Sequence, residues 1–152
     1  MQWKPNATVA AIAEKDGHFL LVEEDIDGKL VFNQPAGHLE QGETLIEAVK
    51  RETLEETAWE FEPESLVGVY LYPSPNDKEI TYLRFCFYGL CTKEHVGQAL
   101  DDGIIRAAWL SPDEIKSEHD RMRSPMVVRC IEDHLKGCSY PLELLNHYIE
   151  SE

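Results

Sequence analysis

Residues 37–59 read GHLEQGETLIEAVKRETLEETAW, a segment that predicts a short loop followed by a helix over Leu45–Thr57. Thr44 precedes this helix, and Glu47 follows three residues later, which is the spacing of a capping box. Residues 45–56 contain neither Gly nor Pro. The Pro-Ala-Gly sequence at the start of the loop ends regular structure, so the helix begins from an irregular segment.

Three glutamates of this helix share one face. Glu52, Glu55 and Glu56 stand at i, i+3 and i+4, so their carboxylates are neighbours and repel one another unless a cation lies among them. Oxygen-rich clusters of this kind suit a hard divalent cation, Mg²⁺ or Mn²⁺, whose coordination phosphate oxygens can complete. Taken alone, the three glutamates fit a solvated acidic face better than a metal site.

Two flanking features favour the metal site. The loop before the helix can bring a backbone carbonyl, such as that of Gly37, beside the acids. Glu43 lies eight residues before Arg51, a spacing that allows an ion pair between the loop and the helix. The simpler interpretation of this pair is an ion pair at the rim, which contributes little to stability.

The other elements predict a mixed architecture. Turn signals at Asp16-Gly17 and Asp27-Gly28 predict hairpins in the first third of the chain. Glu79–Leu90 alternates between two sets of side chains, which is the period of a strand with two distinct faces. Ser111-Pro112 and Ser124-Pro125 begin two further helices. This order of elements predicts an α/β (α+β) domain with helices packed on a sheet.

The loop and helix together resemble the signature of the Nudix hydrolases. The matching residues are Gly37, then Glu43 after five residues, and then, after seven more, the RExxEE pattern of Arg51–Glu56. Two positions differ from the signature: Thr53 stands where a bulky apolar residue is usual, and Ala58 where glycine is usual. If residue 58 needs a positive φ, its Cβ costs about 1 kcal/mol. Neither difference removes a metal ligand.

Shorter segments are similar to the NudJ phosphatase subgroup of this family, and together they span most of the chain. They are NQPAGHLE at 33–40, LRF at 83–85, RSP at 123–125 and YPLE at 140–143. The resemblance implies one Nudix domain over residues 1–152, built as an α/β/α sandwich with a mixed sheet. It also implies a Mg²⁺-dependent phosphoric anhydride hydrolase that releases orthophosphate from nucleoside tri- and diphosphates and from hydroxymethylpyrimidine diphosphate, a thiamine precursor.

The expected metal ligands are carboxylates of the box. Glu52, Glu55 and Glu56 are expected to hold Mg²⁺ or Mn²⁺, and Glu40 and the Gly37 carbonyl are further candidates. A metal held there would offset the charge of the phosphates and lower the pKa of a bound water. A carboxylate then takes the proton of this water as it attacks phosphorus, and Glu55 is preferred over Glu56 for this role.

A second source of the general base lies in a distant loop. Asp101 and Asp102 precede a predicted strand over Ile104–Leu110, and either acid can reach the site from there. A turn before Gly103 explains the two aspartates more simply, because Asp-Gly is a common turn sequence. The sequence leaves both interpretations open.

The candidate substrate-binding residues come from several segments. Arg84 stands in the middle of a strand among aromatic residues, where a charge binds phosphate or forms a structural ion pair. Phe32 stacks on a ring or packs in the core, and the same alternatives apply to Tyr82. The remaining candidates are Gln34, His38 and Arg123, and a surface arginine is the simpler interpretation of Arg123.

Composition excludes several classes of protein. Acidic residues outnumber basic residues by 29 to 14, so the net charge is −15, which disfavours a binder of long DNA or RNA. Apolar stretches are shorter than the roughly 20 residues of a membrane helix, and no signal-peptide pattern is visible. The four cysteines form no CxxC pair. We therefore expect a cytoplasmic monomer or homodimer that binds a small phosphorylated substrate, without contact with a membrane.

Two other functions remain. The chain can be a Nudix pyrophosphohydrolase for an ADP-sugar, a dinucleotide or an oxidised deoxynucleotide, which would cut an internal bond and release a monophosphate. It can also be a non-catalytic Nudix module that only binds a nucleotide. The second alternative predicts that the carboxylates are lost, whereas this chain retains Arg51, Glu52, Glu55 and Glu56.

Overall fold

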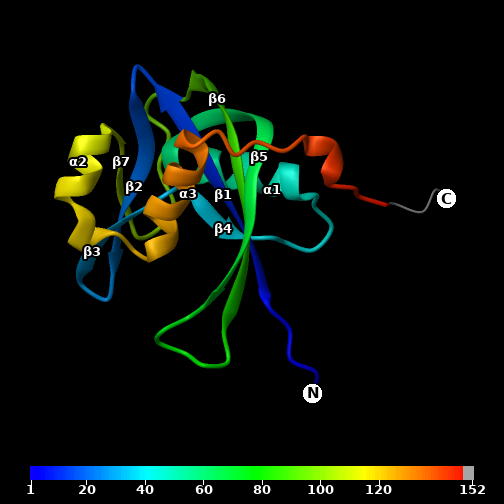
Figure 1. Cartoon of the computed structure of the whole chain (residues 1–152). Helices are drawn as coiled ribbons and strands as arrows, with labels where there is room; N and C mark the ends of the chain where they lie inside the picture. Colours follow the sequence, from blue (N-terminus) through cyan, green and yellow to red (C-terminus); the bar gives the residue numbers. More distant parts are fainter. Residues whose placement is uncertain (149–152) are drawn as a thin grey trace.

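A computed structural model describes residues 1–148 as a sheet with helices on both sides (Figure 1). The strands are β1 (Asn6–Lys15), β2 (His18–Ile26), β3 (Lys29–Asn33), β4 (Ala36–His38), β5 (Trp59–Pro73), β6 (Thr81–Glu94) and β7 (Ile104–Leu110). The helices are α1 (Leu45–Thr57), α2 (Pro112–Ser117) and α3 (Pro125–Leu135), with short 3₁₀ turns at His119–Arg121 and Leu142–Leu144.

The sheet is mixed, as predicted. Its strands run in the order β3-β2-β1-β6-β5, while β4 pairs with β1 and β7 pairs with β2. The pairing of β1 with β6 is parallel, and the other pairings are antiparallel. The parallel register places Thr8 beside Arg84, so the first strand and a strand from the middle of the chain contribute neighbouring residues.

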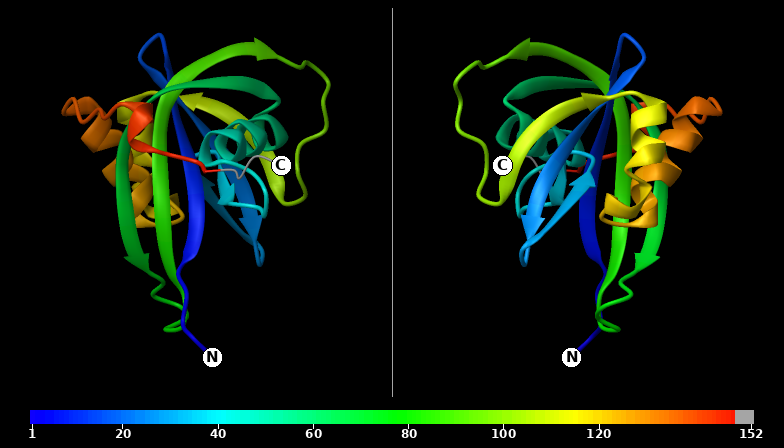
Figure 2. Two further views of the ribbon diagram at one scale, coloured as in Figure 1. Left: turned by 90° about the vertical axis from the view of Figure 1, so that its right-hand side faces the viewer. Right: turned by 90° about the vertical axis from the view of Figure 1, so that its left-hand side faces the viewer.

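Helices cover both faces of the sheet, which confirms the predicted sandwich. Figure 2 shows α1 on one side of the strands and α2 and α3 on the other. The alternation along β6 separates two hydrophobic clusters: Phe87 packs with Val49 of α1, whereas Cys86 packs with Val127 of α3. All four cysteines are free thiols. Within residues 1–148, no helix is long and apolar enough to cross a membrane.

Local signals in the sequence correspond to the observed element boundaries. Asp16 and Gly17 both have positive φ angles, 52° and 76°, and Asp27 and Gly28 repeat this arrangement at the next hairpin. Positive φ at both central residues is what a two-residue hairpin turn needs. Helix α1 spans the predicted residues, and Thr44 forms the predicted capping box.

Helix α1 ends in a left-handed residue that is not glycine. Ala58 has φ 64° and ψ 13°, and its backbone N–H donates to the Leu54 carbonyl at 2.9 Å. This αL cap redirects the chain into β5. The position therefore requires the positive φ for which glycine is the usual residue, and Ala58 bears the steric cost of its Cβ.

Replacing Ala58 with Gly should relieve this strain. We expect Ala58→Gly to raise the free energy of unfolding by about 0.5–1 kcal/mol in urea denaturation, because the relieved strain exceeds the extra chain entropy of glycine in the unfolded state. The matched control is Ala48→Gly in the right-handed interior of α1, which should lower stability. A lower stability of both variants would contradict the assignment of strain to Ala58.

Candidate active site

Three carboxylates from two segments converge beside α1. Glu52, Glu55 and Asp101 each offer one oxygen, and these oxygens all lie within 4.8 Å of one another. The backbone N–H of Asp101 donates to the Glu55 carbonyl at 3.1 Å, which fixes the distant loop against the helix. Oxygen ligands so close together fit a hard divalent cation. Asp102 is exposed and does not belong to this cluster.

Arg51 connects the cluster to the preceding loop. Its Nε and Nη2 donate to the two oxygens of Glu43 at 3.0 and 2.7 Å, so the predicted pair is present and bidentate. Nη2 also donates to the His38 carbonyl at 3.1 Å. These hydrogen bonds hold the pKa of Glu43 below its usual value. They place the loop against the helix with a defined geometry.

The other end of the Arg51 guanidinium faces the acids. Nη1 donates to Glu52 at 2.7 Å and to Glu55 at 3.3 Å, and lies 3.5 Å from the mostly exposed carboxylate of Glu40. Arg51 therefore offsets repulsion among carboxylates that α1 brings together. Burial raises the pKa of Glu52 despite this contact, because the loss of hydration outweighs the interaction with Arg51.

Gly37 lets the backbone of β4 approach helix α1. A Cβ at this position would collide with the carboxylate of Glu52. The predicted closeness of the loop backbone to the acids is therefore present, and it explains why residue 37 has no side chain. Whether the Gly37 carbonyl itself ligates metal stays a prediction.

Glu56 lies apart from the other box carboxylates. It is 7% exposed, and its Oε1 accepts a hydrogen bond from the Ala36 backbone N–H at 2.9 Å. Burial raises the pKa of Glu56 to about 8, and the nearby charges of Glu24 and Glu52 act in the same direction. Glu56 thus lies at the boundary between the acidic cluster and a neighbouring pocket.

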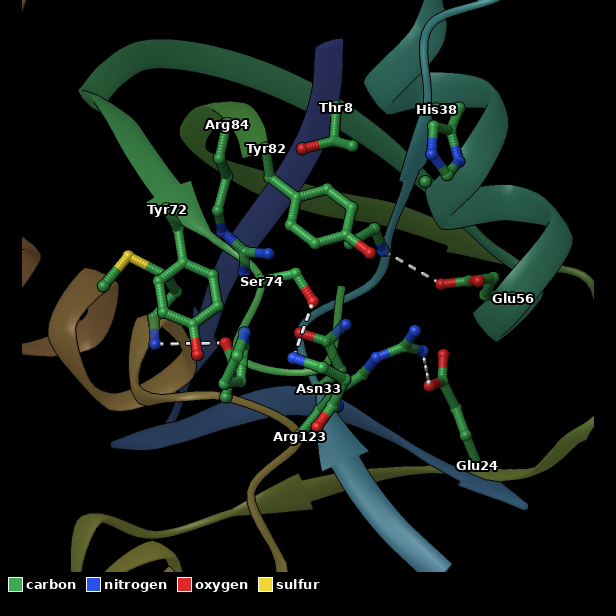
Figure 3. Close-up of a pocket in the computed structure, with 16 residues that line it drawn as sticks. Thr8, Glu24, Asn33, His38, Glu56, Tyr72, Ser74, Tyr82, Arg84 and Arg123 are labelled. Carbon is green, nitrogen blue, oxygen red and sulfur yellow. Dashed lines mark hydrogen bonds and ion pairs between the residues drawn. The ribbon is translucent and has the colours of Figure 1, made fainter. Parts of the chain in front are cut away.

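The pocket has a volume of about 300 Å³ and opens beside Glu56 (Figure 3). Strands β1, β2, β3, β4, β5 and β6, the loop that joins β5 to β6, and the beginning of α3 all contribute to its walls. Its lining residues are Thr8, Glu24, Asn33, Ala36, Gly37, His38, Glu56, Tyr72, Ser74, Pro75, Asn76, Tyr82, Arg84, Arg123, Ser124 and Met126.

Arg84 is a buried cation in this pocket. It is 8% exposed, and its Nη2 donates to the Gln34 side-chain oxygen. Within residues 1–148, no carboxylate forms an ion pair with it, and its Nε has no hydrogen-bond partner. The sequence left two roles open for Arg84, phosphate binding and a structural ion pair. The structural ion pair is absent from the described residues. A buried charge of this kind is stabilised by an anion in the pocket.

The structure brings His38, Tyr82 and Arg123 to the pocket, as expected of substrate-binding candidates. Arg123 is less available than Arg84, because its Nη1 donates to Glu24 at 2.9 Å. Phe32 is buried in the core beneath the guanidinium of Arg121, 4.6 Å from its ring centroid, so its alternative role in stacking is wrong.

Gln34 needs a correction. It is 1% exposed and does not line the pocket, so the prediction that it touches substrate is not supported. Its Nε2 donates to the Val127 carbonyl at 2.7 Å, while its oxygen accepts from Arg84. Both ends of this amide are occupied, and Gln34 acts as a positioning residue for Arg84.

Several lining residues had no signal that singled them out from the sequence. Asn33 and Glu24 come from different strands, and only the folded sheet brings them to one pocket. Tyr72 was detectable in principle: it is the direct cross-strand partner of Tyr82, and the pair is symmetric about the predicted loop after Pro73.

The pKa of Glu56 predicts how stability depends on pH without metal. The folded-state pKa exceeds the unfolded value of 4.5, so this group stabilises the fold fully below pH 4.5, and its contribution is lost as pH rises through about 8. A tenfold difference in proton affinity between the folded and unfolded states is equivalent to about 1.4 kcal/mol. In chelator-treated protein, urea unfolding should therefore reveal falling stability between pH 5 and 8.5.

Glu56→Gln removes this titration. We expect the variant to lose most of that pH dependence, while Glu132→Gln, at an exposed glutamate of α3, keeps the wild-type profile. An unchanged profile in Glu56→Gln would contradict the assignment. Adding Mg²⁺ to the wild-type protein should restore the stability that it loses at high pH, because a cation stabilises the ionised carboxylate of Glu56.

Comparisons with known proteins agree with this geometry. A family model described as the NUDIX domain matches residues 3–129. Phosphatase NudJ from Escherichia coli strain K12 is 38% identical over 146 residues, which cover 96% of this chain and 94% of that protein. A solved NUDIX hydrolase from Nitrosomonas europaea is 48% identical, has a TM-score of 0.94, and aligns over 97% of this chain and 100% of that chain.

More distant structures share the fold alone. A MutT NUDIX hydrolase from Burkholderia pseudomallei has a TM-score of 0.71 at 17% identity, over 86% of this chain and 98% of that chain. The matched domain includes the loop, the helix with its four charged box residues, and all seven strands of the sheet that supports them. The chain belongs to the Nudix hydrolase family.

Proposed function

We propose that this hydrolase is a Mg²⁺-dependent phosphatase of the NudJ type. It would release orthophosphate from nucleoside tri- and diphosphates and from hydroxymethylpyrimidine diphosphate, within a single Nudix domain. The observation that carries the proposal is the position of the acidic cluster next to a pocket whose buried cation, Arg84, lacks a counter-ion among the described residues. Similarity to Phosphatase NudJ over nearly the whole chain supports the substrate class.

The acidic cluster would hold the metal. Glu52, Glu55 and Asp101 are the proposed ligands, with Glu40, Glu56 and the Gly37 carbonyl as further candidates. A bound Mg²⁺ ion would supply charge compensation for the phosphates and a lowered pKa for a coordinated water. Mn²⁺ would suit the same oxygen ligands.

Glu55 is the proposed general base. It is partly exposed and lies in the cluster, where it can accept the proton of the attacking water. Glu56 is less suited to this role, because its raised pKa keeps it protonated near neutral pH until a cation is nearby. Asp101 is the alternative base from the distant loop. Arg51 would hold the ionised acids in place during the proton transfer.

The pocket would bind the rest of the substrate. Arg84 and Arg123 can bind phosphate oxygens, since guanidinium groups match their geometry. Tyr82 offers a face for a planar ring, and His38 lies next to Gly37 at the phosphate end. A volume of about 300 Å³ is at the small end of ligand sites, which favours a single nucleotide or an aminopyrimidine over a dinucleotide.

The alternatives receive less support. A non-catalytic module is disfavoured because the box carboxylates are present and clustered. Solved structures named as a UDP-X diphosphatase and a bifunctional NMN adenylyltransferase/ADP ribose pyrophosphatase are similar in fold alone, at 18% and 24% identity. We propose the cytoplasm as the compartment, because four free thiols are typical of a reducing environment.

A product assay tests the function. Purified protein with Mg²⁺ should convert nucleoside triphosphates to nucleoside diphosphates and orthophosphate. It should also release orthophosphate from hydroxymethylpyrimidine diphosphate. The products of both reactions are identified by ³¹P NMR. Glu55→Gln should lower kcat by about 10²–10⁴-fold, the usual contribution of a general base. Pyrophosphate plus a monophosphate, or cleavage of ADP-ribose alone, would overturn the phosphatase proposal.

A matched pair of aspartates tests the metal site. Asp101→Asn should raise the Mg²⁺ concentration for half-maximal activity by about tenfold or more, given that even groups supporting a ligand contribute 10–100-fold. Asp102→Asn should behave like wild type, because Asp102 lies outside the cluster. Titration of Mn²⁺ binding, by the relaxation of water protons, checks the same difference without turnover. Equal behaviour of the two variants would exclude Asp101 as a ligand.

A further inference from the structure

The segment that carries Asp101, residues 95–103 between β6 and β7, lies along the carboxyl-terminal end of α1 (Figure 2). The His95 backbone N–H donates to the Ala58 carbonyl at 2.7 Å, and the Asp101 backbone N–H donates to the Glu55 carbonyl at 3.1 Å. The last carbonyls of a helix have no partner within the helix itself. This segment, which we call the Asp101 loop, therefore completes hydrogen bonds that α1 leaves open.

Two tight turns, at residues 95–98 and 101–104, give the Asp101 loop its shape. In each turn, the backbone N–H of the fourth residue donates to the carbonyl of the first at 3.1 Å. Only residues 99 and 100 lie between the turns. The far end of the loop is joined to the sheet, because the Gly103 carbonyl accepts from the backbone N–H of Asp25 at 2.8 Å. The position of the first turn on α1 therefore sets the position of Asp101.

Gln98 supplies the one side-chain hydrogen bond from the Asp101 loop to α1 within residues 1–148. Its Nε2 donates to the Leu54 carbonyl at 2.8 Å, and the same carbonyl accepts the backbone N–H of Ala58 in the αL cap. A donor is favourable at this end of a helix, because the aligned peptide dipoles concentrate negative charge there. The Gln98 side chain therefore joins the loop to α1 directly beside Glu55, a member of the acidic cluster.

The Asp101 loop is held at the cluster against electrostatic repulsion. The Asp101 carboxylate has an oxygen within 4.8 Å of oxygens of Glu52 and Glu55. Arg51 contacts both glutamates, but in the described part of the chain it forms no ion pair with Asp101. Like charges at this distance disfavour the arrangement until a cation is bound. In the metal-free protein, the hydrogen bonds between the loop and α1 oppose this repulsion.

We propose that Gln98 is a positioning residue that holds Asp101 at the acidic cluster before a metal binds. A site whose ligands are already in place avoids the cost of ordering them when the ion arrives. Gln98 is exposed and lies outside the cluster, so it acts on the site only through the loop. This inference deepens the proposed function and rests on it for the role of Asp101 as a metal ligand.

Amide hydrogen exchange of the metal-free protein, resolved by NMR, tests the inference without turnover. Gln98→Met has a side chain of similar length but no donor, so the Asp101 amide should exchange about three- to tenfold faster, the effect expected for one lost hydrogen bond. The amide of Val49, inside α1, should exchange as in wild type, which excludes a general loss of stability. Gln98→Lys keeps a donor suited to the end of a helix and should keep most of the protection of Asp101.

Mn²⁺ binding, measured by the relaxation of water protons, tests whether Gln98 acts through Asp101. Gln98→Met should weaken Mn²⁺ binding about three- to tenfold in the wild-type background. It should have little further effect in the Asp101→Asn background, because two residues that act as a unit do not contribute additively. Gln41→Met is the matched control, since Gln41 is exposed and its side chain forms no hydrogen bond with the described residues; it should bind Mn²⁺ like wild type.

The two measurements separate failure of this inference from failure of the proposed function. Unchanged exchange of the Asp101 amide in Gln98→Met would overturn the inference. An equal weakening of Mn²⁺ binding by Gln98→Met with and without Asp101 would also overturn it. If Asp101→Asn binds Mn²⁺ like wild type, the proposed metal site loses Asp101 as a ligand, and exchange of the Asp101 amide alone then decides whether Gln98 positions the loop.

Discussion

The bidentate contact between Arg51 and Glu43 is the interaction on which the site depends. One edge of the guanidinium fixes the loop before α1, and the other edge faces Glu52 and Glu55. Without this cation, the helix would bring carboxylates together with nothing to offset their repulsion. The same group also binds the His38 carbonyl and so sets the position of β4, the strand that borders the pocket.

The carboxylates of α1 occupy two different environments. Glu52 and Glu55 lie beside Arg51 and Asp101, where a cation can replace or join the guanidinium. Glu56 lies outside this cluster, is buried, and accepts a backbone hydrogen bond from Ala36. Two consecutive residues of α1 thus differ in environment: Glu55 belongs to the acidic cluster, whereas burial raises the pKa of Glu56.

Sequence predicted the features that depend on near neighbours. Helix α1 has the expected bounds because its capping box and its αL cap are made by residues within a few positions. The parallel pairing that places Thr8 beside Arg84, and the contact between Gln34 and Val127, join distant segments that no local pattern connects. Gln34 was consequently assigned to substrate, although the fold turns it toward the core.

The neighbours Asn33 and Gln34 explain how one short segment serves two needs. Gln34, which follows the last residue of β3, is buried and binds Arg84 and Val127, whereas Asn33 lines the pocket. In the proposed function, the acidic cluster would serve the cleavage of a phosphoric anhydride, but it would not distinguish one ring from another. Selection among substrates has to come from residues outside the box, and the walls of the pocket bring such residues together from strands that are distant in the sequence.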